Sequence, residues 1–205
     1  MAAGAAGLAL VAYIVVTDAT RERIDLLSDT GFQFLFHNGT SNIKDHYAKR
    51  FDGSPKEVDI LGTRLDRLRA DWHSEFGNWG DRSHVRILLM DPQFPPGSTT
   101  IATIRDEEES NVSGSISNQV GQFIKDSSDA RTRGVAKSFE VRQYKAIPIV
   151  TIVRVDNELF WAPYLHGRRA SSTPTMLVRT GGLLFGVLLE HFDSVWNDAT
   201  TSRVT

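Results

Sequence analysis

Apolar and polar positions along the chain follow two periods, one typical of strands and one typical of helices. Strands are predicted for the stretches FQFLFHN, KEVDILG, HVRILLMDP, SFEVRQYK and PTMLVR. A further stretch, IVTIVRVDNELFWAP, is divided by the turn-prone pair Asp156-Asn157 and therefore predicts a hairpin. HVRILLMDP is almost continuously apolar, which is typical of a strand that is buried on both faces of a parallel sheet.

Three stretches have the helical period. GTSNIKDHYAKRF begins at a Thr40 or Ser41 cap and places Ile43, Tyr47 and Phe51 on one face. Helices are also predicted for RLDRLRADWHSEF and GLLFGVLLEHFDSVWNDA, and residues 93–137 suggest one or two polar helices. Helices and strands alternate and the order ends in consecutive strands, so the sequence predicts an α/β domain with a mixed sheet flanked by helices.

The first 17 residues carry no charge, and Leu8–Val16 is continuously apolar. The run is slightly shorter than the about 20 residues that cross a bilayer comfortably. A cleaved signal peptide requires a basic residue before its apolar core, and none precedes this run. The arginines Arg21 and Arg23 follow it instead. The positive-inside rule then predicts a single-pass protein of the inner (cytoplasmic) membrane with its C-terminal domain in the cytoplasm. The alternative is an alanine-rich buried helix of a soluble protein.

These patterns divide the chain into four parts. We expect a transmembrane helix at 1–18, a helical connector at 19–30, one folded domain at 31–199 and a disordered tail at 200–205. About 185 residues after the apolar run are enough for one domain of ordinary size.

Composition excludes several kinds of site. The net charge of -2 gives no sign of a nucleic-acid partner, and the absence of cysteine excludes disulfides and thiolate zinc sites. The histidines lack metal-ligand spacing, and the acidic run RDEEES at 105–110 favours a solvated helix face over a divalent-ion site. We therefore expect no metal, no cofactor and no nucleic acid.

Four stretches in this order resemble a phospholipase D-like domain: KEVDILGTRL, HVRILLMDP, SFEVRQYKAIPIVTIVRVDNELFWAPYLHG and LFGVLLEHFDSVW. They cover most of residues 56–198. In that family the hairpin carries His-x-Lys-x4-Asp and is followed by Gly-Ser-x-Asn; the histidine attacks phosphorus and the lysine neutralises phosphate oxygens. Two such motifs meet at a twofold axis, so the resemblance implies that a single-domain member pairs with a second copy.

The chain departs from this pattern at the reacting positions. With Asp156 as the aspartate, Ile149 stands at the histidine and Thr151 at the lysine. Isoleucine has no nucleophilic atom and threonine carries no charge, so we expect no enzyme activity of the family's kind and no catalytic residue. Asp156 is expected only to make the hairpin turn.

The residues after the hairpin are the first candidate ligand site. Tyr164, His166, Arg168 and Arg169 follow the second strand, and two adjacent guanidiniums can grip a phosphate bidentately. The alternatives are a solvent-facing loop without function and an enzyme that uses His166 in place of the missing nucleophile.

Arg64 and Arg67, with Arg69, form the second candidate site directly after the strand KEVDILG. If Thr63 starts a helix there, its backbone N–H groups and the arginines face one sheet edge, which is a common anion site. The alternative is an ordinary exposed helix face.

Together these observations predict a membrane-anchored, catalytically inactive sensor or effector. It would bind a phosphate-bearing ligand such as a nucleotide and form a homo-oligomer, as a dimer or larger. A role in bacterial signalling or antiviral (phage) defence is an analogy with domains of this kind. The alternatives are a phosphodiesterase or nuclease with a non-standard site, and a protein-interaction scaffold.

Overall fold

The computed structural model describes residues 28–37, 41–132 and 139–204. The predicted transmembrane helix and most of the predicted connector lie outside these ranges. Among the described residues, no helix has the length and apolar character needed to cross a bilayer.

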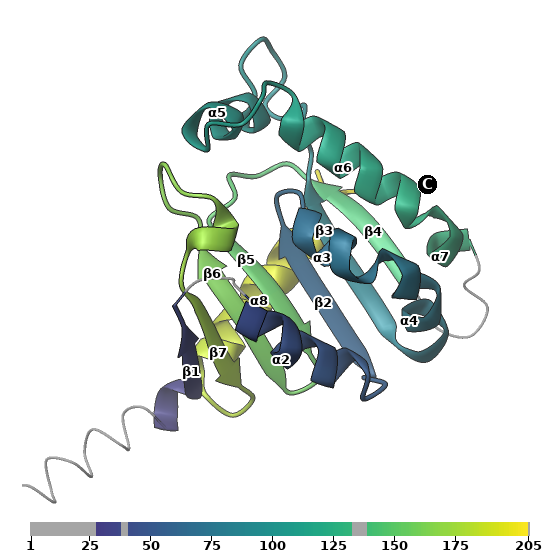
Figure 1. The fold of residues 1–205 in the computed structure, drawn as a ribbon, viewed down its shortest axis with the longest axis vertical. Coiled ribbons are helices and arrows are strands. Elements are labelled where there is room, and N and C mark those ends of the chain that lie inside the picture. Colours follow the sequence, from purple (N-terminus) through teal and green to yellow (C-terminus); the bar gives the residue numbers. More distant parts are fainter. Residues whose placement is uncertain (1–27, 38–40, 133–138, 205) are drawn as a thin grey trace, which may run out of the picture.

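One mixed sheet forms the centre of the described fold (Figure 1), with eight strands in the order β1-β7-β6-β5-β2-β3-β4-β8. Three neighbouring strands are parallel, and the other pairings are antiparallel. The parallel strands are β2 (Glu57–Gly62), β3 (His84–Met90) and β4 (Phe139–Tyr144). The others are β1 (Phe32–Phe36), β5 (Val150–Val155), β6 (Glu158–Pro163), β7 (Thr175–Arg179) and β8 (Ser202–Arg203). The predicted mixed sheet flanked by helices is confirmed.

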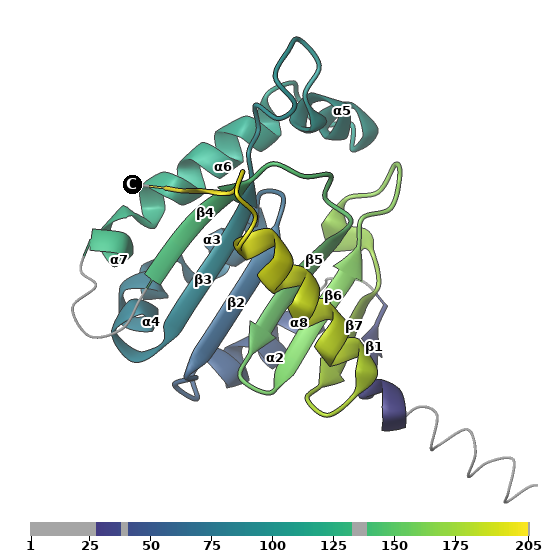
Figure 2. The same ribbon diagram turned by 180° about the vertical axis from the view of Figure 1, so that it is seen from behind.

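Helices cover both faces of this sheet. Figure 1 shows α2 and α3 in front of it, and Figure 2 shows α8 crossing the opposite face. The helices are α2 (Ser41–Phe51), α3 (Asp66–Trp72), α4 (Phe76–Arg82), α5 (Ile101–Glu108), α6 (Ser115–Asp126), α7 (Ser128–Thr132) and α8 (Leu183–Trp196), with short 3₁₀ turns η1 (His73–Glu75) and η2 (Ala170–Ser172).

Burial follows the sequence pattern closely in the sheet and in α2 and α8. Strand β3 is buried on both faces, as its continuous apolar run predicts. Ile43 and Phe51 of α2 are buried, and so are Phe192 and Trp196 of α8. The hairpin between β5 and β6 turns at Asp156, which has a φ of 50°.

Three predicted elements need correction. The helix expected at residues 64–76 is three pieces, α3, η1 and α4, because Leu65 adopts a left-handed φ of 53° and delays the helix start to Asp66. Residues 93–137 hold three helices, α5 to α7, among the residues described there. The tail expected to be disordered adds strand β8, because Ser202 and Arg203 pair with β4.

Candidate ligand-binding cavity

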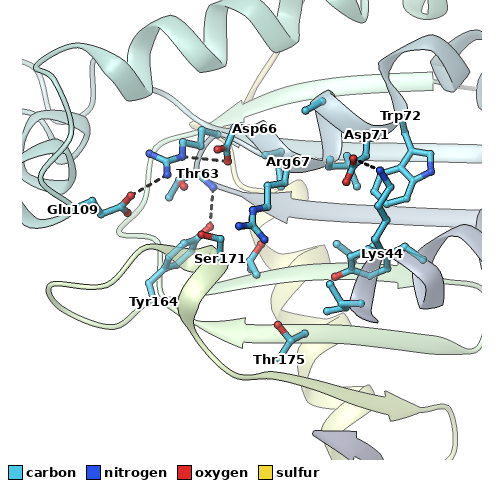
Figure 3. A pocket seen from close by; sticks show the side chains of 18 residues that line it. Lys44, Thr63, Asp66, Arg67, Asp71, Trp72, Glu109, Tyr164, Ser171 and Thr175 are labelled. Carbon is cyan, nitrogen blue, oxygen red and sulfur yellow. Dashed lines mark hydrogen bonds and ion pairs between the residues drawn. The ribbon is translucent and has the colours of Figure 1, made fainter. Parts of the chain in front are cut away.

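A cavity of about 340 Å³ lies between the sheet and the helices α2 and α3. Its volume is within the range of small-molecule sites, which begins at about 300 Å³. Its lining includes Thr151 and Val153 of β5, Thr175 of β7, the segment that follows β2, and Ser171 of η2 (Figure 3). One lining residue, Thr151, lies in the hairpin on which the resemblance to phospholipase D-like domains rests.

The lining of the cavity has two chemically different parts. Toward α2 it is largely apolar and aromatic, with Ile43, Tyr47, Leu68, Trp72 and Val153, and it also holds the ion pair of Lys44 with Asp71. Toward the end of β2 it is polar, with Thr63, Arg64, Arg67, Tyr164 and Ser171.

The polar part depends on how the chain leaves β2. The chain packs closely where it leaves β2, because a Cβ on Gly62 would meet the end of the Leu65 side chain. Thr63 does not begin a helix, contrary to the prediction, and its backbone N–H donates to the Tyr164 hydroxyl at 2.9 Å. The predicted anion site on free backbone N–H groups at Thr63 is therefore wrong, because a side chain already satisfies that donor.

Tyr164 thus fixes the end of β2. Burial of its ring raises the pKa of the hydroxyl, so it stays protonated at neutral pH. The Arg105 guanidinium lies 5.4 Å from the ring centroid. Tyr164 lines the cavity and also closes its polar end.

Arg64 is buried and already paired. Its Nη2 lies 3.0 Å from Oε2 of Glu109, and its Nε lies 3.3 Å from Oδ1 of Asp66. Glu109 in turn pairs with Arg105 at 2.6 Å. The prediction of a solvated helix face for the acidic run at 105–110 is therefore wrong, because Asp106 and Glu109 are both buried.

Arg67 differs from Arg64 although only two residues separate them. It is exposed, and Figure 3 shows its guanidinium extending from α3 toward the middle of the cavity. Lys44, another cation of the lining, pairs with Asp71 at 2.5 Å and lies 6.0 Å from the Trp72 ring centroid. Arg67 is thus an exposed cation of the lining that extends into the cavity.

The family's reacting positions serve other purposes here. The Thr151 hydroxyl donates to the Leu61 carbonyl at 2.9 Å, and the Ile149 side chain is 59% exposed just before β5. The Asp156 carboxylate accepts from the backbone N–H groups of Lys56 and Glu57 at 2.8 and 2.9 Å. Asp156 therefore holds the hairpin turn against the start of β2.

The loop that carries His166, Arg168 and Arg169 is exposed, and none of these three residues lines the cavity. His166 is 88% exposed in its side chain, with Nδ1 2.9 Å from Oε1 of Glu108. Arg105 ties the loop down by donating to the Arg168 carbonyl at 3.2 Å. The structure thus separates the loop residues from Arg64, Arg67 and Tyr164, which it brings together.

Sequence reasoning missed three contributors to this region: Lys44 and Trp72 in the lining, and Arg105 behind it. Arg105 and Glu109 have the i, i+4 spacing of a helix ion pair, a signal that was present. Nothing local indicates that this pair lies behind Arg64 and Tyr164, because the contact joins segments about 40 to 60 residues apart.

No protein-family model matches the chain, and no curated protein matches it. Among solved structures, phosphatidylserine synthase from Haemophilus influenzae, a phospholipase D-like superfamily member, is similar in fold, with a TM-score of 0.51, 12% identity and coverage of 83% of this chain and 39% of that one. The archaeal chromatin protein TrmBL2, described with a novel mode of DNA binding, has a TM-score of 0.49, 12% identity and coverage of 94% and 64%. The chain thus spans less than two thirds of each protein. At this identity the likeness to the synthase concerns the fold alone.

Proposed function

We propose that the chain is a catalytically inactive phospholipase D-like domain that binds a nucleotide or a similar phosphate-bearing molecule in this cavity. The two-part lining is the observation that carries the proposal. A nucleotide has a flat, largely apolar base at one end and an anionic phosphate at the other. The aromatic part with Tyr47 and Trp72 suits the base, and Arg67 suits the phosphate.

Space and charge support this assignment. Apolar walls with a few convergent polar groups are typical of small-molecule sites. Arg67 is exposed and its guanidinium extends into the cavity, so we expect it to contact the anion directly (Figure 3). Ser171 of η2 adds a hydroxyl to the polar part of the lining.

Binding without turnover is what the reacting positions favour. Isoleucine at 149 and a threonine at 151 that donates to the backbone cannot form a phosphoenzyme or neutralise phosphate. We also propose membrane anchoring through residues 1–17 at the inner membrane, with the domain in the cytoplasm, and assembly into a homo-oligomer. A ligand that changes this assembly would make the protein a sensor or effector in bacterial signalling or phage defence.

The test is thermal unfolding of the detergent-solubilised full chain with a panel of linear and cyclic nucleotides. At least one nucleotide should raise Tm. Arg67→Ala should weaken its binding roughly 10- to 100-fold, the value of one charge-assisted hydrogen bond. The double variant Arg168→Ala/Arg169→Ala is the matched control, and its exposed arginines should account for about fivefold or less.

Two results would contradict the proposal. If no nucleotide raises Tm, the protein-interaction scaffold becomes the better account. If the double variant abolishes binding while Arg67→Ala leaves it unchanged, the ligand lies on the exposed loop and not in the cavity.

The pairing of His166 with Glu108 favours one second candidate, a phosphodiesterase or nuclease with a non-standard site. A carboxylate on Nδ1 orients an imidazole so that Nε2 can act as a general base. General acid–base groups contribute about 10²- to 10⁴-fold to a rate. His166→Ala should therefore remove turnover of a generic phosphodiester by that factor; if the native chain has no turnover, this candidate is excluded.

A further inference from the structure

An exposed apolar corner lies at one end of the domain, away from the cavity. Leu183 and Val187, on the first turns of α8, are 68% and 53% exposed. Leu35 of the edge strand β1 is 46% exposed. We call these three exposed side chains, on α8 and on the edge strand β1, the β1–α8 corner.

The backbone holds the two parts of this corner together. A Cβ built on Gly182 would lie 2.2 Å from the Cα of Gly31, so the residue before α8 touches the residue before β1. Only glycine at both positions permits this approach. Figure 2 shows the start of α8 beside the start of β1, at the end of the sheet opposite α5 and α6.

This corner is also where the N-terminal segment joins the domain. The first described residue, Ser28, lies three residues before Gly31 and its carbonyl accepts from the Gly31 N–H at 3.0 Å. Only residues 18–27 separate Ser28 from the uncharged run of residues 1–17. Ten residues reach at most about 35 Å, so an anchor formed by that run keeps the corner close to the bilayer.

We propose that the β1–α8 corner rests in the lipid surface, with Leu183 and Val187 inserted among the headgroups and upper acyl chains. This inference rests on the membrane anchoring in the proposed function. Large exposed aliphatic side chains on one helix face are suited to the interface between headgroups and acyl chains. Residues 18–27 then keep Leu183 and Val187 within about 35 Å of that interface. The cavity lies on the opposite face of the sheet, under α2 and α3, and stays accessible from the cytoplasm.

The absence of cysteine makes a site-specific test direct, because any introduced cysteine is unique. An environment-sensitive dye would be attached to Val187→Cys in the full chain. Val112→Cys is the matched control, since Val112 is also an exposed valine, at 84%, and lies between α5 and α6 at the other end of the sheet. Both proteins would be reconstituted into vesicles of phosphatidylethanolamine and phosphatidylglycerol that contain lipids with a nitroxide near the headgroup.

We expect the lipid nitroxide to reduce the fluorescence at position 187 roughly twofold or more, and to leave position 112 unchanged. Both variants should unfold at the native Tm, which shows that neither label disturbs the fold. If the protein floats with the vesicles but position 187 is not quenched, the corner does not touch lipid and only this inference is wrong. If the protein does not float with the vesicles, the anchor is wrong as well. A blue-shifted dye at 187 without vesicles would mean that a second copy or the N-terminal segment covers the corner, which also overturns the inference.

Discussion

The two faces of the central sheet differ in what surrounds their charged residues: one face has a cluster of ion pairs and the other has a cavity. On the α8 face, the buried Asp59 carboxylate of β2 lies 2.6 Å from Arg86 of β3 and 2.6 Å from Arg154 of β5. Arg86 continues to Asp193 of α8 at 2.8 Å and lies 4.8 Å from the Phe192 ring centroid. On the α2–α3 face, Thr151 and Val153 of β5 and Thr175 of β7 line the cavity.

The difference shows how charged residues in a sheet separate into structural and ligand-binding groups. Around Asp59 each charge has an opposite partner and an aromatic ring fills the remaining surface, so nothing is left for a ligand to bind. At the cavity, Arg67 is exposed beside about 340 Å³ of space that no side chain fills. Unfilled volume next to an exposed cation distinguishes the second face, whereas the number of charges does not.

The largest effect on stability should come from the α8 face. Asp59→Ala removes the shared partner of two arginines that are largely covered, which costs about 4 kcal/mol of unfolding free energy. Urea unfolding measures it, with Asp193→Ala as the control. Asp193 is an exposed partner of Arg86, so its loss should cost less than about 1 kcal/mol. Equal losses in the two variants would show that the Asp59 cluster is no more than a surface network.

A smaller effect concerns pH and the cavity face. Burial raises the pKa of Tyr47, and therefore its folded form stays protonated where the unfolded chain ionises. Stability from this group is complete below pH about 10 and falls above it, by about 1.4 kcal/mol per pH unit. Tyr47→Phe should remove this part of the slope between about pH 10 and 11. Identical slopes in the native chain and the variant would place the Tyr47 hydroxyl in water.

The smallest effect should come from the Tyr164 hydroxyl. Tyr164→Phe leaves the Thr63 N–H without its acceptor at the end of β2, which costs about 1 kcal/mol. Differential scanning calorimetry would detect the change, and Tyr47→Phe at neutral pH is the control because the Tyr47 hydroxyl accepts from no backbone N–H of the described residues. A stability equal to that of the native chain would mean that water replaces the hydroxyl at Thr63.

The sequence predicts the framework well and the site only in part. The hairpin at Asp156, the buried β3 and the faces of α2 and α8 follow from patterns within one element. The start of α3 does not, because the pattern of apolar residues carries no sign of the left-handed conformation of Leu65. The ion pair of Arg64 with Glu109 does not follow from a local pattern either, since it joins residues 45 positions apart. This ion pair buries part of an acidic run that was expected to face solvent.

Of the residues predicted to bind a ligand, some line the cavity and others do not. Arg67 and Tyr164 follow strand ends at the cavity, and strand ends are where sequence reasoning looks for ligands. Arg168 and Arg169 also follow a strand, but their loop carries them away from the cavity and Arg105 donates hydrogen bonds to its backbone. The β1–α8 corner does not follow from the sequence pattern, because the contact of Gly31 with Gly182 joins opposite ends of the domain sequence.

The most direct test of the central claim is the heat of binding of the nucleotide that gives the largest Tm shift, measured with a variant that fills the cavity. Ala70 lines the cavity from an exposed position on α3, so Ala70→Trp should occupy the ligand's space without disturbing the core. Gln122→Trp, at an exposed position on α6 outside the lining, is the control. We predict that Ala70→Trp abolishes the heat of binding and that Gln122→Trp binds like the native chain. Unchanged affinity in Ala70→Trp would contradict the account.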